Sequence, residues 1–202
     1  MMMWLYVGLG VSICLWITLG MHVFSEIKTT YQEKGTFSNK LLYSWYAMWA
    51  FHHIPVVLAS WFGVWLIPVD RTLGQIGGLI LFLVGVALLP AGMIELRSLR
   101  RSTGQDISKL ITTGIYRWSR NPQFVGWFLM LLGVSIAGRS GCALALTFAF
   151  MVVLHLYTVR LAEPYLENVY GEEYRRYLLS TSRYIGIPKE RGSSADRTTG
   201  DR

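Results

Sequence analysis

The sequence has 202 residues, of which 52% are hydrophobic and only 15% are charged, and its mean hydropathy is positive. This composition excludes a pair of soluble domains and is typical of one membrane-embedded unit. The net charge of +7 requires no nucleic-acid partner, because basic cytoplasmic loops facing anionic lipid headgroups account for it. We therefore predict an all-α integral membrane bundle over residues 1–188, surrounded by the lipid bilayer, and a polar, disordered tail over 189–202.

Five hydrophobic segments are the predicted membrane spans, at about 1–24, 44–69, 73–94, 122–138 and 141–159. A helix needs about 20 apolar residues to cross the hydrocarbon core, so the first three are long enough and the last two are marginal. A Gly-Arg-Ser-Gly turn at 138–141 separates those two and predicts a tight helical hairpin. No Lys or Arg precedes the first segment, which favours a membrane span there over a signal peptide.

Basic residues are concentrated in alternate loops. The first loop, the third loop and the C-terminal region carry nearly all the Lys and Arg, whereas the second and fourth loops carry one each. By the positive-inside rule, the basic loops and the C-terminus are predicted to face the cytoplasm and the N-terminus the opposite side. A bacterial inner membrane and an endoplasmic reticulum membrane are both compatible with this orientation.

A polar motif, GIYRWSRNPQFVGW at 114–127, directly precedes the fourth hydrophobic segment. Asn121 followed by Pro122 predicts a helix start, with Asn as N-cap and Pro at the first helical position. The free backbone N–H groups there, together with Arg117 and Arg120, suit a carboxylate or a phosphate. The alternative is that Asn-Pro only starts the helix and the arginines only anchor it at the headgroups.

A second polar region follows the fifth segment. Arg160 and Glu163 are one helical turn apart and form either a simple i,i+3 ion pair or part of a site. Beyond Pro164, apolar and aromatic residues recur every three or four positions, which predicts one amphipathic helix on the cytoplasmic membrane surface. This helix is either a lid over a cavity or only a surface element. Its apolar positions are Leu166, Val169, Tyr170, Tyr174, Tyr177 and Leu178.

The histidines and cysteines do not predict a metal site or a disulfide. A haem or metal site between helices is conceivable, because all four histidines lie in or near predicted spans. No pair of them has the spacing of a ligand motif, so we favour hydrogen-bonded polar positions within the bundle. The four are His22, His52, His53 and His155.

The two polar regions together resemble the isoprenylcysteine carboxyl methyltransferase and phospholipid methyltransferase family of integral membrane enzymes. That family has a pattern close to G-x-Y-R-x-x-R-H-P-x-Y-x-G, followed by E-E-x-x-L, F-G-E-E-Y-x-x-Y and a terminal R-x-x-P-like stretch. The resemblance covers about 109–188. The first block is matched by Gly114, Tyr116, Arg117, Arg120, Pro122 and Gly126. The later blocks are matched by Glu163, Leu166, Gly171, Glu172, Glu173, Tyr174 and Tyr177, and more loosely by Arg183 and Pro188.

Three positions depart from the family pattern. Asn121 replaces the His, Phe124 replaces the Tyr, and Ala162 stands where the first Glu would be. Asn121 keeps hydrogen-bonding capacity but cannot titrate as His does. An Asn-Pro pair also occurs in phospholipid N-methyltransferases, which tilts the expectation away from a prenylcysteine acceptor.

The resemblance implies S-adenosylmethionine as the cofactor and Arg120 and Glu163 as the catalytic residues. Arg120 at a helix N-terminus suits the cofactor's carboxylate, and Glu163 suits its ammonium or a ribose hydroxyl. Aromatic rings suit the sulfonium, and Gly126 is expected to let the backbone approach the cofactor closely. The implied cofactor-binding set is Tyr116, Arg117, Arg120, Asn121, Pro122, Gln123, Phe124, Gly126, Glu163 and Tyr165.

The implied reaction is methyl transfer to a lipophilic acceptor that partitions into the membrane. An isoprenylcysteine-type carboxylate, a phospholipid amine and a small thiol all remain open as acceptors. One alternative is an NADPH-dependent sterol-type reductase, which shares a similar first block. In such reductases Glu commonly follows the last Gly, whereas Trp127 follows Gly126 here. The other alternative is a non-catalytic membrane scaffold of the same fold.

Overall fold

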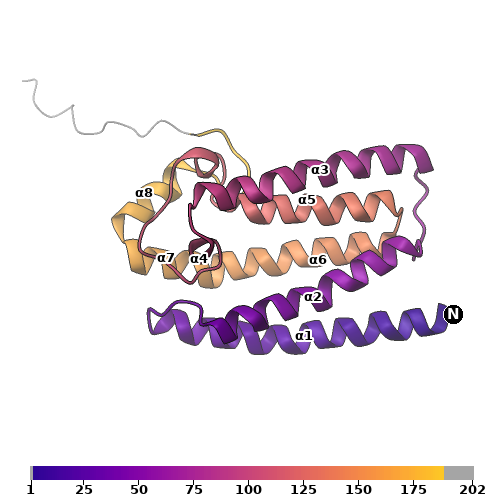
Figure 1. Cartoon of the computed structure of the whole chain (residues 1–202), viewed down its shortest axis with the longest axis horizontal. Helices are drawn as coiled ribbons and strands as arrows, with labels where there is room; N and C mark the ends of the chain where they lie inside the picture. The colour runs from indigo at the N-terminus through magenta and orange to yellow at the C-terminus, as the bar shows by residue number, and fades with distance from the viewer. Residues whose placement is uncertain (1, 189–202) are drawn as a thin grey trace, which may run out of the picture.

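The long helices of the protein lie side by side, and the short helices gather at one end, as the computed structural model shows (Figure 1). The structure describes residues 2–188, so the predicted disordered tail at 189–202 lies outside the described residues. The long helices are α1 (Met2–Gln32), α2 (Asn39–Trp61), α3 (Arg71–Glu95), α5 (Pro122–Ala137) and α6 (Gly141–Tyr157). The short elements are α4 (Leu99–Ser102), η1 (Gly114–Arg117), η2 (Thr158–Ala162), α7 (Glu163–Tyr170) and α8 (Glu172–Ser180).

The helix starts follow local sequence signals. The hydroxyl of Ser38 accepts a hydrogen bond from Leu41 N–H at 3.1 Å, and the hydroxyl of Ser140 accepts one from Ala143 N–H at 3.2 Å. Asp70 caps α3 in the same way. These contacts satisfy amide groups that have no partner within the first helical turn.

Three of the five predicted membrane spans correspond to helices of sufficient length and hydropathy. Among residues 2–188, the segments long and apolar enough to cross a membrane are α1, α3 and the continuous run Gly141–Tyr170. The 16 residues of α5 extend about 24 Å, which is shorter than the hydrocarbon core of about 30 Å. The 23-residue helix α2 packs beside α1, α5 and α6. The all-helical membrane fold is therefore confirmed.

Two predicted helix boundaries are wrong. The predicted second span continued to residue 69, but α2 ends at Trp61, because the chain turns at Gly63 and Trp65, where φ is 58° and 57°. The single amphipathic helix predicted beyond Pro164 is two helices, α7 and α8. They meet at Gly171, whose φ of 56° ends α7.

The hydrophobic core lies between α1, α2, α5 and α6. Trp16, Trp45 and Trp49 form its aromatic centre together with Phe150 of α6. The adjacent ring of His52 is 1% exposed, and its Nε2–H donates to the carbonyl of Leu146 at 3.0 Å. The expectation that the bundle histidines are hydrogen-bonded is confirmed here.

Helix α3 packs on α5 through backbone contacts instead of large side chains. A Cβ atom added to Gly78 would lie 2.5 Å from the carbonyl oxygen of Gly133, and one added to Gly85 would lie 2.5 Å from that of Gly126. Such close approach is typical of glycine-lined interfaces between membrane helices. The residues that α3 buries are all glycines: Gly74, Gly78, Gly85 and Gly92.

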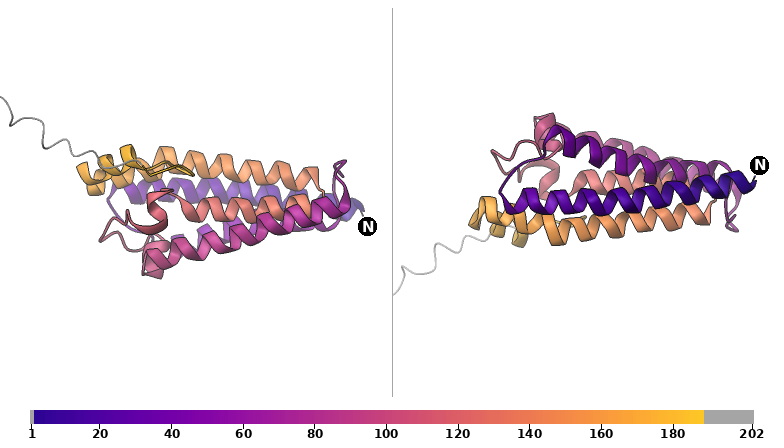
Figure 2. Two further views of the ribbon diagram at one scale, coloured as in Figure 1. Left: turned by 90° about the horizontal axis from the view of Figure 1, so that it is seen from above. Right: turned by 90° about the horizontal axis from the view of Figure 1, so that it is seen from below.

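The two ends of the bundle are built differently (Figure 2). At the end that holds the N-terminus, the turn between α5 and α6 is fastened to the loop between α2 and α3. There the Ser140 hydroxyl donates to the carbonyl of Val64 at 2.7 Å, and Gly141 N–H donates to the carbonyl of Trp65 at 2.9 Å. The opposite end carries the segments 33–38 and 96–121 together with α7 and α8, and residues of 96–121, α7 and α8 line a cavity there.

We predict that Gly78→Ala destabilises the bundle by about 1–3 kcal/mol, because the added methyl group collides with the backbone of α5. The matched control is Gly77→Ala in the same helix, where an added Cβ meets no atom within 4 Å. The thermal unfolding midpoint of the detergent-purified variants checks this. Equal midpoints for the two variants would contradict close helix contact at Gly78.

Candidate functional site

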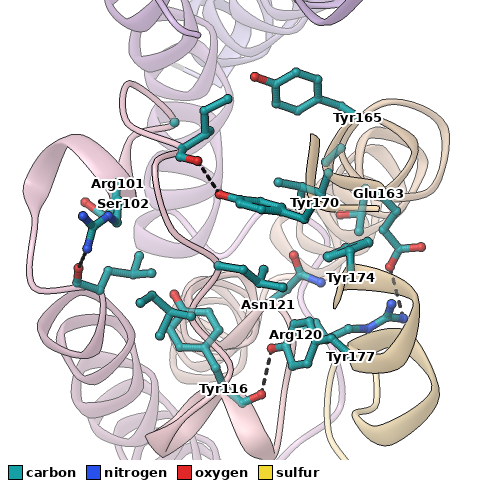
Figure 3. A pocket seen from close by; sticks show the side chains of 18 of the residues that line it. Arg101, Ser102, Tyr116, Arg120, Asn121, Glu163, Tyr165, Tyr170, Tyr174 and Tyr177 are labelled. Carbon is teal, nitrogen blue, oxygen red and sulfur yellow. Dashed lines mark hydrogen bonds and ion pairs between the residues drawn. The ribbon is translucent and has the colours of Figure 1, made fainter. Parts of the chain in front are cut away.

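A cavity of about 230 Å³ opens at the loop end of the bundle (Figure 3). Its walls come from the end of α1, from residues 96–111, from the start of α5 and from the helical run that ends in α8. The side chains that line it include Tyr31, Arg101, Asp106, Tyr116, Arg120, Asn121, Phe124, Tyr157, Glu163, Tyr165, Tyr170, Tyr174 and Tyr177.

One carboxylate lies at the centre of the polar wall. Glu163 receives the Nε and Nη2 groups of Arg183 at 2.8 Å each, one on each oxygen, and Arg120 Nη2 lies 3.1 Å from Oε1. The side chains of Arg120 and Glu163 are only 8% and 12% exposed. Two cations share one anion, so the cluster has an excess positive charge. Among the described residues, the Nε and Nη1 atoms of Arg120 are buried without a hydrogen-bond partner.

The position of Glu163 depends on an irregular helical turn. Residues of η2 form a π turn, and the amide of Glu163 donates to the carbonyl of Thr158, five residues earlier. Single π turns of this kind occur frequently at functional sites. The predicted local pair with Arg160 does not form, because Arg160 is exposed and Glu163 pairs with Arg120 and Arg183.

Residues 181–188, the C-terminal segment, are fastened to the motif that precedes α5. Arg120 N–H donates to the carbonyl of Ser182 at 3.0 Å, and Gly186 N–H donates to that of Trp118 at 3.1 Å. The side-chain amide of Asn121 donates to the carbonyl of Arg183 at 3.1 Å and makes no N-cap hydrogen bond. Pro122 starts α5 as predicted, but the expected Asn cap is replaced by this link to the C-terminal segment.

Tyrosines form the remaining wall. The hydroxyl of Tyr177 donates to the carbonyl of Tyr116 at 2.7 Å, and both rings pack against Tyr174 in a small core. Burial raises the pKa of Tyr174 to about 12; the carboxylate of Glu163 acts in the same direction, and the positive charge of Arg120 opposes it. Burial also raises the pKa of Tyr116 and Tyr177 well above the ordinary tyrosine value. These hydroxyls therefore remain protonated at neutral pH, and those of Tyr116 and Tyr177 donate to the carbonyls of Gly92 and Tyr116.

A second cavity of about 290 Å³ adjoins the first one on the side of the bundle core. The two cavities share Ser102, Gly104, Phe124 and Tyr157 in their walls. Among the described residues that line the second cavity, none is charged, and most are aromatic or aliphatic. They include Phe37, Leu42, Trp45, Tyr46, Leu89, Met93, Gln123 and Trp127.

The structure places the predicted cofactor-binding residues in different environments. The first cavity is lined by Tyr116, Arg120, Asn121, Phe124, Glu163 and Tyr165. Gln123 lines the second cavity, Arg117 is exposed to solvent, and Pro122 is buried at the start of α5. Gly126 faces α3, where an added Cβ would lie 2.9 Å from the carbonyl oxygen of Gly85. Gly126 therefore allows α5 to approach α3 closely, whereas we had expected it to allow the backbone to approach the cofactor.

The sequence motifs did not indicate several of the residues that line the first cavity. Tyr31 and Tyr157 lie far apart in the chain, within apolar helices, and no local motif marks them. Arg101 and Asp106 form an ion pair of 3.2 Å in a loop that has no recognisable pattern. The sequence indicated Arg183 only weakly, because it matched the terminal stretch of the family pattern loosely.

Comparison with known proteins is consistent with these motifs. The profile of the phospholipid methyltransferase family matches residues 73–173, which is half of the chain. The chain belongs to this family. The match runs from α3 to the beginning of α8 and includes Arg120 and Glu163, whereas α1 and α2 lie outside it. No solved structure matches the chain.

The curated relatives compared with this chain are named protein-S-isoprenylcysteine O-methyltransferase. The human protein-S-isoprenylcysteine O-methyltransferase is 28% identical over 131 residues, which cover 60% of this chain and 44% of the relative. The mouse protein of the same name is 30% identical over 109 residues, covering 50% and 37%. That of Saccharomyces cerevisiae is 30% identical over 82 residues, covering 39% and 32%. The chain therefore spans less than half of the length of these relatives.

We predict that Arg183→Gln loosens the C-terminal segment and lowers the unfolding midpoint, because Glu163 then keeps only Arg120 as a cationic partner. The control is Arg175→Gln, which removes two exposed surface ion pairs, to Glu167 and Glu172, that contribute little. Hydrogen–deuterium exchange of 181–188 measures the effect. Unchanged exchange in Arg183→Gln would show that the Glu163 ion pair does not hold this segment.

Proposed function

We propose that the protein transfers a methyl group from S-adenosylmethionine to a lipophilic acceptor that enters from the membrane. The observation that carries this proposal is the buried guanidinium of Arg120, a residue that lines the first cavity, pairs with Glu163 and keeps two buried nitrogen atoms without a hydrogen-bond partner among the described residues. Family membership supports methyl transfer, and the names of the curated relatives support a lipid-type acceptor.

The donor set of the first cavity fits the charges of this cofactor. The unpartnered nitrogens of Arg120 are suited to its carboxylate, because a charged hydrogen bond there satisfies atoms that are otherwise buried alone. Glu163 has about four acceptor positions, of which its two arginine partners occupy three. One position is left for the cofactor's ammonium or for a ribose hydroxyl. Phe124 and Tyr165 offer aromatic faces for the sulfonium.

The second cavity is the proposed location of the acceptor's apolar body. Its uncharged, aromatic wall favours a hydrophobic molecule, and no buried ion has to be desolvated there. Because the two cavities share part of their walls, a cofactor in the first and an acceptor in the second would meet at this boundary. Fixing two reactants in this way and excluding water are sufficient for in-line methyl transfer.

We also propose an orientation of the protein in the membrane. The basic first and third loops and the C-terminal helices lie at the end of the bundle that carries the cavity (Figure 1). The positive-inside rule therefore assigns that end to the cytoplasm, where a water-soluble cofactor is available. The polar site then lies at the membrane surface, next to the hydrocarbon that holds the acceptor.

We expect Arg120→Gln and Glu163→Gln to weaken the binding of S-adenosylmethionine by about tenfold to a hundredfold, as the loss of a charged hydrogen bond requires. Arg117→Gln, in the same motif but exposed, is the matched control and should bind like the native protein. Calorimetric titration in detergent measures this, and the unfolding midpoint confirms folding. Native-like binding by both cavity variants, or binding of NADPH in place of S-adenosylmethionine, would refute the proposed cofactor site.

Transfer of a labelled methyl group identifies the acceptor class. Three probes cover the candidate chemistries: S-farnesyl-N-acetylcysteine for a carboxylate, phosphatidylethanolamine vesicles for an amine and dodecanethiol for a thiol. We expect a labelled product from at least one probe. A folded protein that binds S-adenosylmethionine but labels none of them would favour the non-catalytic scaffold.

A further inference from the structure

Tyr157 lies at the boundary between the two cavities. It is the last residue of α6, directly before the π turn that places Glu163, and it contributes to the wall of both cavities. Of the four residues shared by the two walls, Ser102 and Tyr157 have a side-chain hydroxyl. Ser102 belongs to the short helix α4, whereas Tyr157 belongs to the apolar run Gly141–Tyr170. A hydroxyl here lies where the two proposed reactants would meet.

A second tyrosine holds Tyr157 in place. The hydroxyls of Tyr31 and Tyr157 are 2.8 Å apart, a hydrogen bond between α1 and α6. The ring of Tyr31 stacks on Tyr165, with centroids 3.9 Å apart and planes inclined by 5°. The hydroxyl of Tyr165 in turn donates to the carbonyl of Gly35 at 2.6 Å. Tyr31 is thus fixed both through its ring and through its hydroxyl.

The pair has one hydrogen-bond donor to spare. Two phenol groups have two protons, and their mutual hydrogen bond uses only one of them. Within residues 2–188, the hydroxyls of Tyr31 and Tyr157 make no other hydrogen bond with a side chain or the backbone. The unused proton is therefore available to a ligand at the boundary of the cavities.

The second cavity also lacks a proton acceptor of suitable strength. No Asp, Glu, His or Lys is among the described residues that line it. An acceptor that had to lose a proton during methyl transfer would find no general base in this cavity. The carboxylates of the adjoining first cavity, Asp106 and Glu163, are already paired with arginines. A nucleophile that arrives already ionised needs only a hydrogen-bond donor to hold it.

We propose that the hydroxyl of Tyr157, oriented by Tyr31, donates a hydrogen bond to an anionic oxygen or sulfur of the methyl acceptor. This inference rests on the proposed methyl transfer. A lone pair of the nucleophile forms the new bond to the methyl carbon, and the carbon–sulfur bond of the sulfonium breaks with its electron pair remaining on sulfur. The negative nucleophile and the positive sulfonium both become neutral, so no proton moves. Tyr157 contacts the acceptor, and Tyr31 is a positioning residue.

The test compares Tyr157→Phe and Tyr31→Phe with Tyr43→Phe, whose side chain is 71% exposed and lines neither cavity. With S-farnesyl-N-acetylcysteine as probe, whose carboxylate is ionised at neutral pH, we expect Tyr157→Phe to lower kcat/KM about tenfold to a hundredfold. Tyr31→Phe should cause a smaller loss, and Tyr43→Phe none. Calorimetric affinity for S-adenosylmethionine should stay at the native value in all three variants. The unfolding midpoint should fall equally and only slightly in Tyr157→Phe and Tyr31→Phe, because both lose the same interhelical hydrogen bond.

The outcomes separate this inference from the function on which it rests. Native kcat/KM in Tyr157→Phe, with an active native protein, overturns the role of the hydroxyl and leaves the methyl transfer intact. An equal fall in cofactor affinity, unfolding midpoint and kcat/KM identifies a purely structural hydroxyl and also overturns it. Activity of the native protein on phosphatidylethanolamine alone overturns the anionic nucleophile. Inactivity on all three probes overturns both proposals together.

Discussion

The ion pairs of Glu163 are the interaction on which the site depends. One carboxylate connects three separate parts of the chain: the motif before α5 through Arg120, the long helix that continues from α6, and the C-terminal segment through Arg183. Removing a carboxylate from water is costly, and here two guanidinium groups compensate for that cost. The hydrogen bonds to Glu163 also raise the pKa of Arg183, so this guanidinium stays charged throughout the physiological range.

The same cluster explains how a polar site is compatible with an apolar bundle. The first cavity is lined by several charged residues, whereas the described residues that line the second cavity are uncharged. The boundary between the two environments is made of Phe124 and Tyr157, together with the loop residues Ser102 and Gly104. A phenol is suited to such a boundary because its ring is apolar and its hydroxyl is polar.

The elements that the sequence predicts correctly are those with a local signal. Pro122 marks the start of α5, and long apolar runs mark the spans, because both depend only on neighbouring residues. The partner of Glu163 was not predictable in this way, since Arg160 is close in sequence whereas Arg183 becomes close only after the chain folds back. Gly126 shows a related limit of prediction from sequence. A glycine indicates that another group can approach the backbone closely, but it does not indicate whether that group is a helix or a ligand.

The glycine contacts between α3 and α5 have a consequence for the loop above them. Interlocked backbones cannot slide along each other, so the ends of α3 and α5 stay at a constant separation. The segment 96–121 joins the end of α3 to the start of α5 and lines part of both cavities. A movement of this segment relative to α3 and α5 must therefore come from bending within the segment itself, because the two helices that hold its ends act as a rigid frame.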